Sequence, residues 1–340
     1  MVLTSNIYLV VKERLHGSDK PSNILEIKYP CDNICYNIVM KIEYLVEKQF
    51  ENCEIRSILA RKFKMSGTMI KKLKLYGRVD LNGTHVRVID SAKAGDMLFC
   101  EFEDNSGPLN RVPGIPILFE NGSYAVVDKP SGMVTHPGHG HLDDSLLTHL
   151  SSSPLHPVMR LDRETSGLII IAKDGYAHNT LSVHAGITKR YKALTYGKWD
   201  KETGTIDMPI ARRPGSVMIR DCVTDGTGRD SITHYSVLEY YPDKDISLVE
   251  YQLETGRCHQ IRVHSLYMGH PLLGDGLYGP NSIDNPSDRF PKSLELDKEM
   301  GRVALHAYSL KFNDPLEKGI LREFESPLPP DMAALTGRTE

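Results

Sequence analysis

A polar turn, Arg160-Leu161-Asp162-Arg163-Glu164-Thr165-Ser166-Gly167, leads directly into an apolar run, Leu168-Ile169-Ile170-Ile171. The branched apolar run has the composition of a buried strand, which places Asp162 on a loop at the mouth of a sheet. The neighbouring arginines favour the ionised form of this carboxylate. An oriented carboxylate can attack a sugar carbon or stabilise an oxocarbenium ion, as cleavage of a glycosidic bond requires. The alternative is that Asp162 only caps the turn or pairs with Arg160 or Arg163.

The length and composition of the chain are those of an ordinary globular protein. Its 340 residues, 40% hydrophobic and 25% charged, suffice for two or three domains. No apolar run is long enough to cross a bilayer, and the start of the sequence has no signal-peptide pattern, so we expect a cytoplasmic protein without membrane contact. The six cysteines are scattered, which suits a reducing compartment. Cys31 and Cys35 lack a second pair at zinc-site spacing, so no metal site is expected there.

A basic cluster without any acidic residue runs from Ile55 to Arg78, although the formal net charge of the whole chain is −3. Such a local cluster is the electrostatic footprint of a polyanion partner. Its cations are Arg56, Arg61, Lys62, Lys64, Lys71, Lys72, Lys74 and Arg78.

Residues 1–39 show no sustained period, and Pro21 and Pro30 interrupt them. We expect a poorly ordered N-terminal extension, with the hypothesis that the native start codon lies downstream of Met1. Alternation from Met40 to Tyr44 then predicts the first strand of a folded unit.

Residues 40–104 are predicted to form a small domain. Two apolar stripes between residues 55 and 76 predict two short helices, with Ser66-Gly67-Thr68 between them capping the second. Asn82-Gly83 predicts a hairpin turn, and a last strand follows from Met97 to Phe102.

This order of elements resembles the alpha-L RNA-binding domain, named from a ribosomal small-subunit protein. In that family the basic face of the helix pair lies on structured RNA. The alternative is a basic helix hairpin that is merely solvated. The resemblance implies RNA contacts from Arg56, Arg61, Lys62, Lys71 and Lys72.

The rest of the chain divides into a turn-rich linker at 105–112, a large domain at 113–326, and a tail at 327–340 with little sign of order. In the large domain, strands outnumber helices and are joined by short connections. We therefore predict an α+β protein with a mixed, mostly antiparallel sheet rather than a doubly wound one. Strands are expected at 117–120, 124–128, 168–171, 189–197, 233–241, 247–254 and 303–312, and helices at 175–186 and about 257–268.

A second motif, Lys189-Arg190-Tyr191-Lys192-Ala193-Leu194, carries a phenol among cations. Strand geometry places Tyr191 and Ala193 on one face. Tyr191 can exchange a proton with a substrate, or it is simply a half-buried residue of the sheet.

A third motif runs from Glu254 to His264. Helical spacing puts His259 and Arg262 on one face, and an arginine there is expected to hold a catalytic carboxylate through a fork of two hydrogen bonds. The alternative, a metal site of His259, His264 and His270, lacks a nearby acid or thiol to complete it.

The three motifs in this order resemble the RluA-type pseudouridine synthases, over roughly residues 113–326, and the alpha-L domain in front is a common companion in RluD-like members. The resemblance implies that Asp162 is the catalytic aspartate, which attacks or assists at the ribose anomeric carbon. Tyr191 would remove the proton from carbon 5 of the uracil ring, and Arg262 would orient Asp162 through an ion pair.

Two more positions gain a role from the resemblance. Arg160 would replace the extruded base in the RNA stack, and Leu253 matches an apolar position near the flipped uracil. The chain departs from the family at Met159, where many members have histidine. The loop from Thr135 to His141 resembles the family's His-Pro loop rather than a metal cluster.

The leading hypothesis is therefore an RNA pseudouridine synthase that acts on uridine in structured RNA, with ribosomal RNA favoured over transfer RNA. It would need no metal or organic cofactor and no obligate protein partner, and it would be a monomer. Two alternatives are a non-catalytic RNA-binding or ribosome-assembly factor, and a nucleoside hydrolase that releases free uracil.

Overall fold

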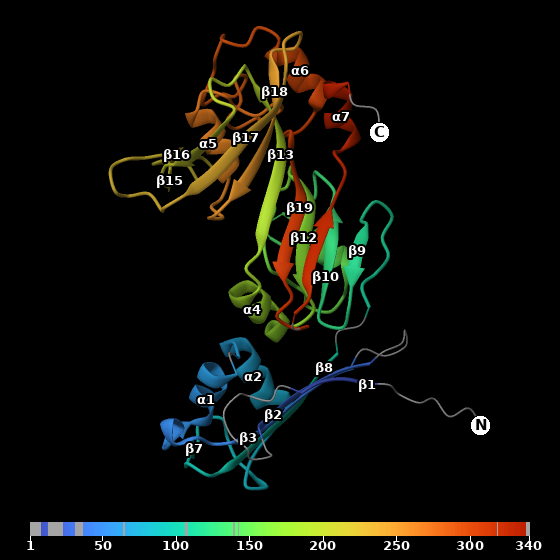
Figure 1. Ribbon diagram of the computed structural model, residues 1–340, viewed down its shortest axis with the longest axis vertical. Helices are drawn as coiled ribbons and strands as arrows, with labels where there is room; N and C mark the ends of the chain where they lie inside the picture. The colour runs from blue at the N-terminus through green and yellow to red at the C-terminus, as the bar shows by residue number, and fades with distance from the viewer. Residues whose placement is uncertain are drawn as a thin grey trace, which may run out of the picture.

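The computed structural model describes residues 8–12, 23–30, 37–63, 65–105, 108–138, 140–141, 143–317 and 319–337. Figure 1 shows a smaller N-terminal part, coloured blue to cyan, and a larger part that holds the rest of the chain. Each part is built on its own sheet.

The N-terminal sheet has the strand order β1-β2-β3-β8-β5-β6, and every pairing in it is antiparallel. Helices α1 and α2 pack beside it, and their apolar stripes supply buried Ile58, Leu59 and Leu73. The elements are β1 (Tyr8–Lys12), β2 (Asn23–Pro30), β3 (Asn37–Leu45), η1 (Lys48–Phe50), β4 (Cys53–Glu54), α1 (Ile55–Lys62), α2 (Gly67–Tyr76), β5 (Arg78–Leu81), β6 (Thr84–His85), β7 (Ser91–Ala92) and β8 (Met97–Asn105).

The local signals of this part are confirmed. The Oγ of Ser66 accepts a hydrogen bond from the Met69 N–H at 3.2 Å and caps α2. Asn82 and Gly83 both have positive φ, 52° and 79°, as the tight hairpin turn between β5 and β6 requires.

The expectation of little order in residues 1–39 is not met at 8–12 and 23–30, which form β1 and β2. The sequence Asn23–Pro30 (NILEIKYP) alternates apolar and charged residues over part of its length, and it pairs with β3 from Asn23↔Tyr44 to Lys28↔Val39. The remainder of residues 1–36 lies outside the described residues, as do Ser106 and Gly107 of the predicted linker. Leu109 of that linker is buried in the core of the large part.

The second sheet has ten strands, in the order β14-β17-β18-β13-β19-β12-β10-β9, with β11 added to β12 and β20 to β19. Of its described pairings only β12 with β19 is parallel, which confirms the mixed, mostly antiparallel sheet. The strands are β9 (Ile117–Glu120), β10 (Tyr124–Lys129), β11 (His156–Pro157), β12 (Ser166–Ala172), β13 (Thr188–Tyr196), β14 (Thr203–Asp207), β17 (Ile232–Tyr241), β18 (Ile246–Leu253), β19 (Leu305–Asn313) and β20 (Leu321–Glu325).

The parallel contact is short and depends on Gly167. Only Ser166↔His306 and Gly167↔Ala307 pair, at the point where the polar turn enters β12. Gly167 has φ +115°, and a Cβ there would lie 2.3 Å from the Ala307 carbonyl oxygen. Glycine therefore lets β12 and β19 approach each other directly beside the Asp162 loop.

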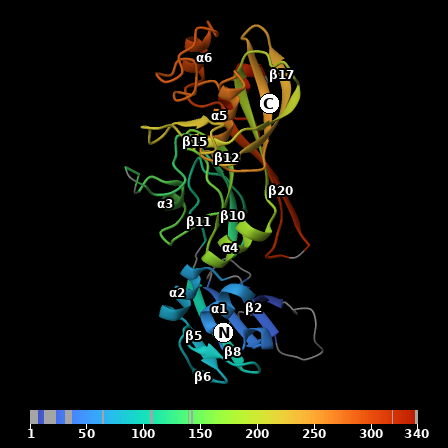
Figure 2. The ribbon, with the colours of Figure 1, turned by 90° about the vertical axis from the view of Figure 1, so that its left-hand side faces the viewer.

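Helices and a small hairpin flank this sheet (Figures 1 and 2). They are α3 (Leu146–Leu150), α4 (Gly175–His184), α5 (Gln260–Tyr267), α6 (Ser293–Met300) and α7 (Pro330–Thr336), with the hairpin of β15 (Ile210–Arg212) and β16 (Arg220–Cys222). No helix of the described chain is long and apolar enough to span a membrane.

The tail is more ordered than expected, because α7 covers residues 330–336. Its Met332 and Leu335 are buried against α6 and the strands behind it. Arg302 clamps the start of α7, since its Nε and Nη2 donate to Asp331 at 2.6 and 2.8 Å. Buried side chains and the ion pair with Arg302 hold this short helix, and the sequence pattern alone did not reveal these contacts.

The two parts of the molecule meet at α4. Tyr176, in its first turn, packs against apolar residues of both parts. Figure 2 shows α4 at the base of the large part, above α1 and α2.

Candidate active site

A cavity of about 610 Å³ opens where the loop before β12 faces the loop between β18 and α5. Residues from all three sequence motifs line it, so the fold brings together segments that are about 100 residues apart. The sequence-predicted residues on its wall are Arg160, Asp162, Tyr191, Leu253 and Arg262.

The loop that carries Asp162 is fixed through its main chain. The Oγ1 of Thr135 donates to the Leu161 carbonyl at 3.0 Å, and the Gly132 N–H donates to the Arg163 carbonyl at 2.9 Å. The Thr165 N–H closes a turn onto the Asp162 carbonyl at 3.1 Å. The carboxylate itself is left free to face the cavity, with its side chain 31% exposed.

Lys129 supports the main chain of this loop, a role that the sequence reasoning missed. Its side chain is fully buried, and Nζ donates to the carbonyls of Pro130, Met133 and Arg163 at 2.8, 2.8 and 3.2 Å. Burial lowers the pKa of Lys129 to about 8, although the nearby charge of Asp162 opposes that shift. The sequence signal that could have revealed this role is a lysine at the end of an apolar strand, directly before Pro130-Ser131-Gly132.

Arg262 faces Asp162 from the first turn of α5. Its Nη1 lies 3.6 Å from Oδ2 of Asp162, so the expected ion pair is present. The expected fork is not made to Asp162, because Nε and Nη2 donate instead to Asp275 at 2.7 and 2.6 Å. Burial opposes the charge of Arg262, but the two carboxylates outweigh burial and raise its pKa.

Asp275 is the second residue that sequence reasoning missed. Its side chain is fully buried, and Oδ1 also accepts the N–H groups of Leu277 and Tyr278 at 3.0 Å. The chain reaches this position through Gly274, where φ is +68° and a Cβ would lie 1.9 Å from the Arg302 carbonyl oxygen. Asp275 therefore fixes the guanidinium whose free end meets Asp162.

Tyr191 and Ala193 share the buried face of β13, as predicted, and both belong to the core beneath the cavity. Burial, with a contribution from the charge of Asp162, raises the pKa of Tyr191 well above its usual range. The phenol is therefore neutral at physiological pH.

Arg160 and Leu253 lie on the cavity wall in different settings. Arg160 is exposed, while Leu253 is half-buried and packs against the core. Met159, at the position that departs from the family pattern, is half-buried in the same wall.

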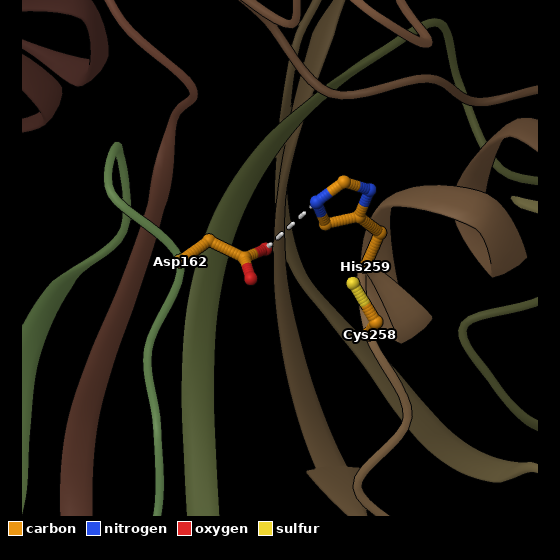
Figure 3. Close-up of side chains that lie close together, drawn as sticks. All are labelled: Asp162, Cys258 and His259. Atoms are coloured by element: carbon orange, nitrogen blue, oxygen red, sulfur yellow. Dashed lines mark ion pairs between the residues drawn. The ribbon is translucent and has the colours of Figure 1, made fainter. Parts of the chain in front are cut away.

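The three histidines considered as metal ligands do not converge. His264 bonds to Thr233 and to the Met208 carbonyl, and His270 donates to the Tyr196 carbonyl at 2.9 Å. Only His259 reaches the cavity, where Nε2 lies 3.9 Å from Oδ2 of Asp162 (Figure 3). Burial lowers its pKa, against the opposing charge of Asp162. His259 precedes α5 with a left-handed φ of 59°, so the helix begins later than the predicted residue 257.

The basic residues of the N-terminal part differ in how far they are neutralised. Arg61 and Lys71 are exposed. Arg56 is exposed beside Glu54, whereas Lys62 is half-buried, with Nζ 2.7 Å from Glu47. Lys72 is half-buried, and Lys64 lies outside the described residues.

A carboxylate on a cavity wall, steadied by a buried arginine and accompanied by a neutral phenol, is suited to breaking a glycosidic bond. The family model described as RNA pseudouridylate synthase matches residues 123–267, which include all three motifs.

The chain is also similar to named proteins over most of its length. It is 36% identical over 290 residues to the uncharacterized RNA pseudouridine synthase YlyB of Bacillus subtilis, which covers 79% of this chain and 88% of that protein. It is 39% identical over 243 residues to ribosomal large subunit pseudouridine synthase D of Nitrosomonas europaea, covering 68% and 67%. The structure of human RNA pseudouridylate synthase domain containing 1 matches with a TM-score of 0.51 and 25% identity, over 66% of this chain and 89% of that one.

The chain belongs to the RNA pseudouridine synthase family. It is an enzyme that isomerises uridine to pseudouridine in RNA.

Proposed function

We propose that this enzyme modifies uridines in ribosomal RNA, with Asp162 as its catalytic residue. The observation that carries the site assignment is the Asp162 carboxylate, which opens on the cavity while Arg262, locked by Asp275, stands 3.6 Å away. Relatives named as ribosomal large subunit pseudouridine synthase D support ribosomal over transfer RNA.

The first chemical task is to break the bond between the uracil nitrogen and the ribose. Asp162 attacks the anomeric carbon or stabilises the positive charge that develops there. Arg262, 3.6 Å from Oδ2, holds the carboxylate facing the cavity until the sugar arrives. The electron pair of the broken bond leaves with the uracil ring, which then turns so that carbon 5 faces the sugar.

The second task is to form the carbon–carbon bond and remove the proton from carbon 5. We assign that removal to Tyr191. Its phenol is neutral, and ionising a phenol with even an ordinary pKa of about 10 costs roughly 4 kcal/mol at pH 7. Tyr191 therefore takes up the carbon-bound proton only as its own proton passes to the uracil nitrogen that kept the electron pair of the broken bond, after the new bond has made carbon 5 acidic.

The target base must leave the RNA stack to reach this cavity, which costs a few kcal/mol. Arg160, exposed at the mouth, fills the vacated place in the stack, while Leu253 packs against the extruded uracil. The apolar residues on the wall, among them Met159 and Leu253, also keep water from the cleaved sugar, since water would convert isomerisation into hydrolysis.

The N-terminal part serves as the alpha-L RNA-binding domain in this proposal, with residues 40–104 as its extent and residues 113–326 as the catalytic domain. Helices α1 and α2, joined by a capped turn and followed by the Asn82-Gly83 hairpin, support it. Exposed Arg56, Arg61 and Lys71 would contact phosphates, and the enzyme would act as a cytoplasmic monomer.

Tritium release from RNA labelled at carbon 5 of uridine tests the substrate. Ribosomal and transfer RNA would be prepared separately from a strain that lacks this gene, and each would be incubated with the enzyme. We expect release from ribosomal RNA alone. Release from transfer RNA alone would move the substrate to that class, and release of free uracil would indicate hydrolysis instead.

A further inference from the structure

Three metal-ligating side chains meet at the mouth of the cavity. Asp162, Cys258 and His259 each point one ligand atom toward the others, and these three atoms lie within 4.8 Å of one another (Figure 3). The sequence alone indicated no nearby acid or thiol that would complete a metal site at His259. The fold supplies the acid from a loop about 100 residues away, and the thiol is the adjacent residue.

The spacing of these atoms fits a small tetrahedral cation. Bonds of about 2.0–2.3 Å place the ligand atoms of a tetrahedral Zn²⁺ about 3.3–3.7 Å apart. The His259 Nε2 and the Asp162 Oδ2 are 3.9 Å apart, and all three ligand atoms lie within 4.8 Å of one another, so a cation would draw them together by up to about 1 Å. Solvent in the cavity would supply a fourth ligand.

The imidazole of His259 is already oriented for this purpose. Its Nδ1 lies 2.8 Å from the hydroxyl of Tyr278, a residue that is fully buried and also accepts the Arg220 N–H at 3.0 Å. Nε2 is thereby turned toward Asp162. A partner on the second ring nitrogen is the usual way in which proteins hold a metal-binding histidine.

Charge balance also suits a divalent cation. Arg262 is shared between Asp275, which accepts two short hydrogen bonds from it, and Asp162, which lies 3.6 Å from Nη1, so Arg262 offsets the charge of Asp162 only in part. The carboxylate and a Cys258 thiolate together carry the charge that a divalent cation requires. The exposed position of Cys258 gives the cation a direct route from solvent.

We propose that Asp162, Cys258 and His259 form an inhibitory site for Zn²⁺ or another thiophilic divalent cation. The cation binds the carboxylate oxygen, the imidazole Nε2 and the thiolate, and the thiol proton passes to solvent. Mg²⁺ prefers all-oxygen ligands and does not occupy the site. The bound cation occupies the carboxylate of Asp162 and thereby blocks catalysis. The cation is therefore an inhibitor and not a cofactor of the reaction.

Binding of Co²⁺ to the full chain without RNA tests the site by spectroscopy. Wild type should bind one Co²⁺ and show thiolate-to-cobalt charge-transfer absorption, which Zn²⁺ abolishes. Cys258→Ser should lose that absorption, while Cys222→Ser, which removes a half-buried thiol of β16, should keep it. Charge-transfer absorption that survives in Cys258→Ser, or its absence from wild type, would overturn the proposal.

Inhibition then links the site to activity. Zn²⁺ should inhibit tritium release by wild type and by Cys222→Ser, and a chelator should restore it. Cys258→Ser should keep the basal activity and require at least about tenfold more Zn²⁺, by analogy with the loss that follows removal of metal-supporting residues. Equal inhibition of wild type and Cys258→Ser would show that zinc acts elsewhere, including on the RNA.

Discussion

Two carboxylates on opposite sides of Arg262 differ in almost every respect except their shared cation. Asp275 is fully buried and accepts four hydrogen bonds, two from Arg262 and two from main-chain N–H groups. Asp162 is 31% exposed and meets Arg262 only across 3.6 Å, with no hydrogen bond to its carboxylate from the described part of the chain.

This difference distinguishes a carboxylate that stabilises the structure from a carboxylate that is available to react. A carboxylate with its acceptor positions filled gains little from a substrate and loses much if its partner is removed, because a buried unpaired charge is costly. A carboxylate that is steadied by one distant cation keeps its lone pairs for chemistry. The same arginine thus fixes one acid and leaves the other available.

Replacing the available acid gives the largest effect on activity. Asp162→Asn keeps the shape of the side chain but removes the nucleophilic charge, so we expect tritium release to fall by at least about 10⁴-fold, equivalent to roughly 5 kcal/mol of transition-state stabilisation. The free energy of unfolding should change by less than about 1 kcal/mol, since the pair is partly exposed. Activity within tenfold of wild type would remove Asp162 from its role.

Replacing the buried acid, Asp275, should instead cause a large loss of stability. Asp275→Ala leaves the Arg262 guanidinium buried without its partner, which costs about 3–5 kcal/mol in the free energy of unfolding, measured with urea. Asp284→Ala is the control, because it breaks a surface pair with Arg213 and should cost under about 1 kcal/mol. If Asp275→Ala does not fold, Asp275→Asn should fold with an intermediate loss. Equal stability of both alanine variants would show that Asp275 contributes no more to stability than a surface acid does.

Sequence reasoning reached the available acid but not the buried one, and the reason is physical. Strand alternation, the Asn82-Gly83 turn and the Ser66 cap are local properties, and the structure confirms them. Asp162 was found because its motif carries chemistry in a short segment. Asp275 and Lys129 act through partners that are chosen by the fold, so no local period marks them.

The same limit explains the elements that were missed. Helix α7 is short and is held by tertiary contacts rather than by a long amphipathic pattern. The left-handed φ of His259 delays the start of α5, although helical spacing had included that residue. Contacts between segments that are distant in the sequence determine both the presence of α7 and the start of α5.

The support beneath Asp162 can be tested through pH. His306 is buried on β19 and its Nδ1 lies 3.0 Å from the Oγ of Ser166, at the entry of β12. Burial lowers the pKa of His306 in the folded protein to about 4, from an ordinary value of 6.5. The unfolded chain therefore takes up this proton first, and stability present above about pH 6.5 is lost as the pH falls toward 4.

We expect wild type to lose about 2–3 kcal/mol from this one group between pH 7 and pH 4.5. His306→Gln removes the proton uptake, so the pH dependence of its unfolding free energy should be shallower by that amount, measured with urea at each pH. His184→Gln, at an exposed site on α4, should follow wild type. Parallel curves for wild type and His306→Gln would assign the acid sensitivity to other groups.

The cations of α1 and α2 also divide into those that are already paired with an acid and those that are not. Replacing them should have the smallest effects of the variants considered. Lys62 is already paired with Glu47 at 2.7 Å and lies over the Tyr44 ring. Arg61 and Lys71 are exposed and form no ion pair with any described residue. If this part binds RNA through phosphates, each available cation should contribute about 0.7–0.9 to the slope of log affinity against log salt.

Neutralising Arg61 and Lys71 together should therefore reduce the magnitude of that slope by about 1.4–1.8, measured with ribosomal RNA fragments over a range of salt. Lys62→Gln should reduce it much less, because binding of Lys62 to a phosphate must first break its pair with Glu47. The triple variant should then resemble the double one. If Lys62→Gln alone matches the double variant, Glu47 does not hold Lys62 back in the complex, and a static ion pair is a poor guide to which cations reach the RNA.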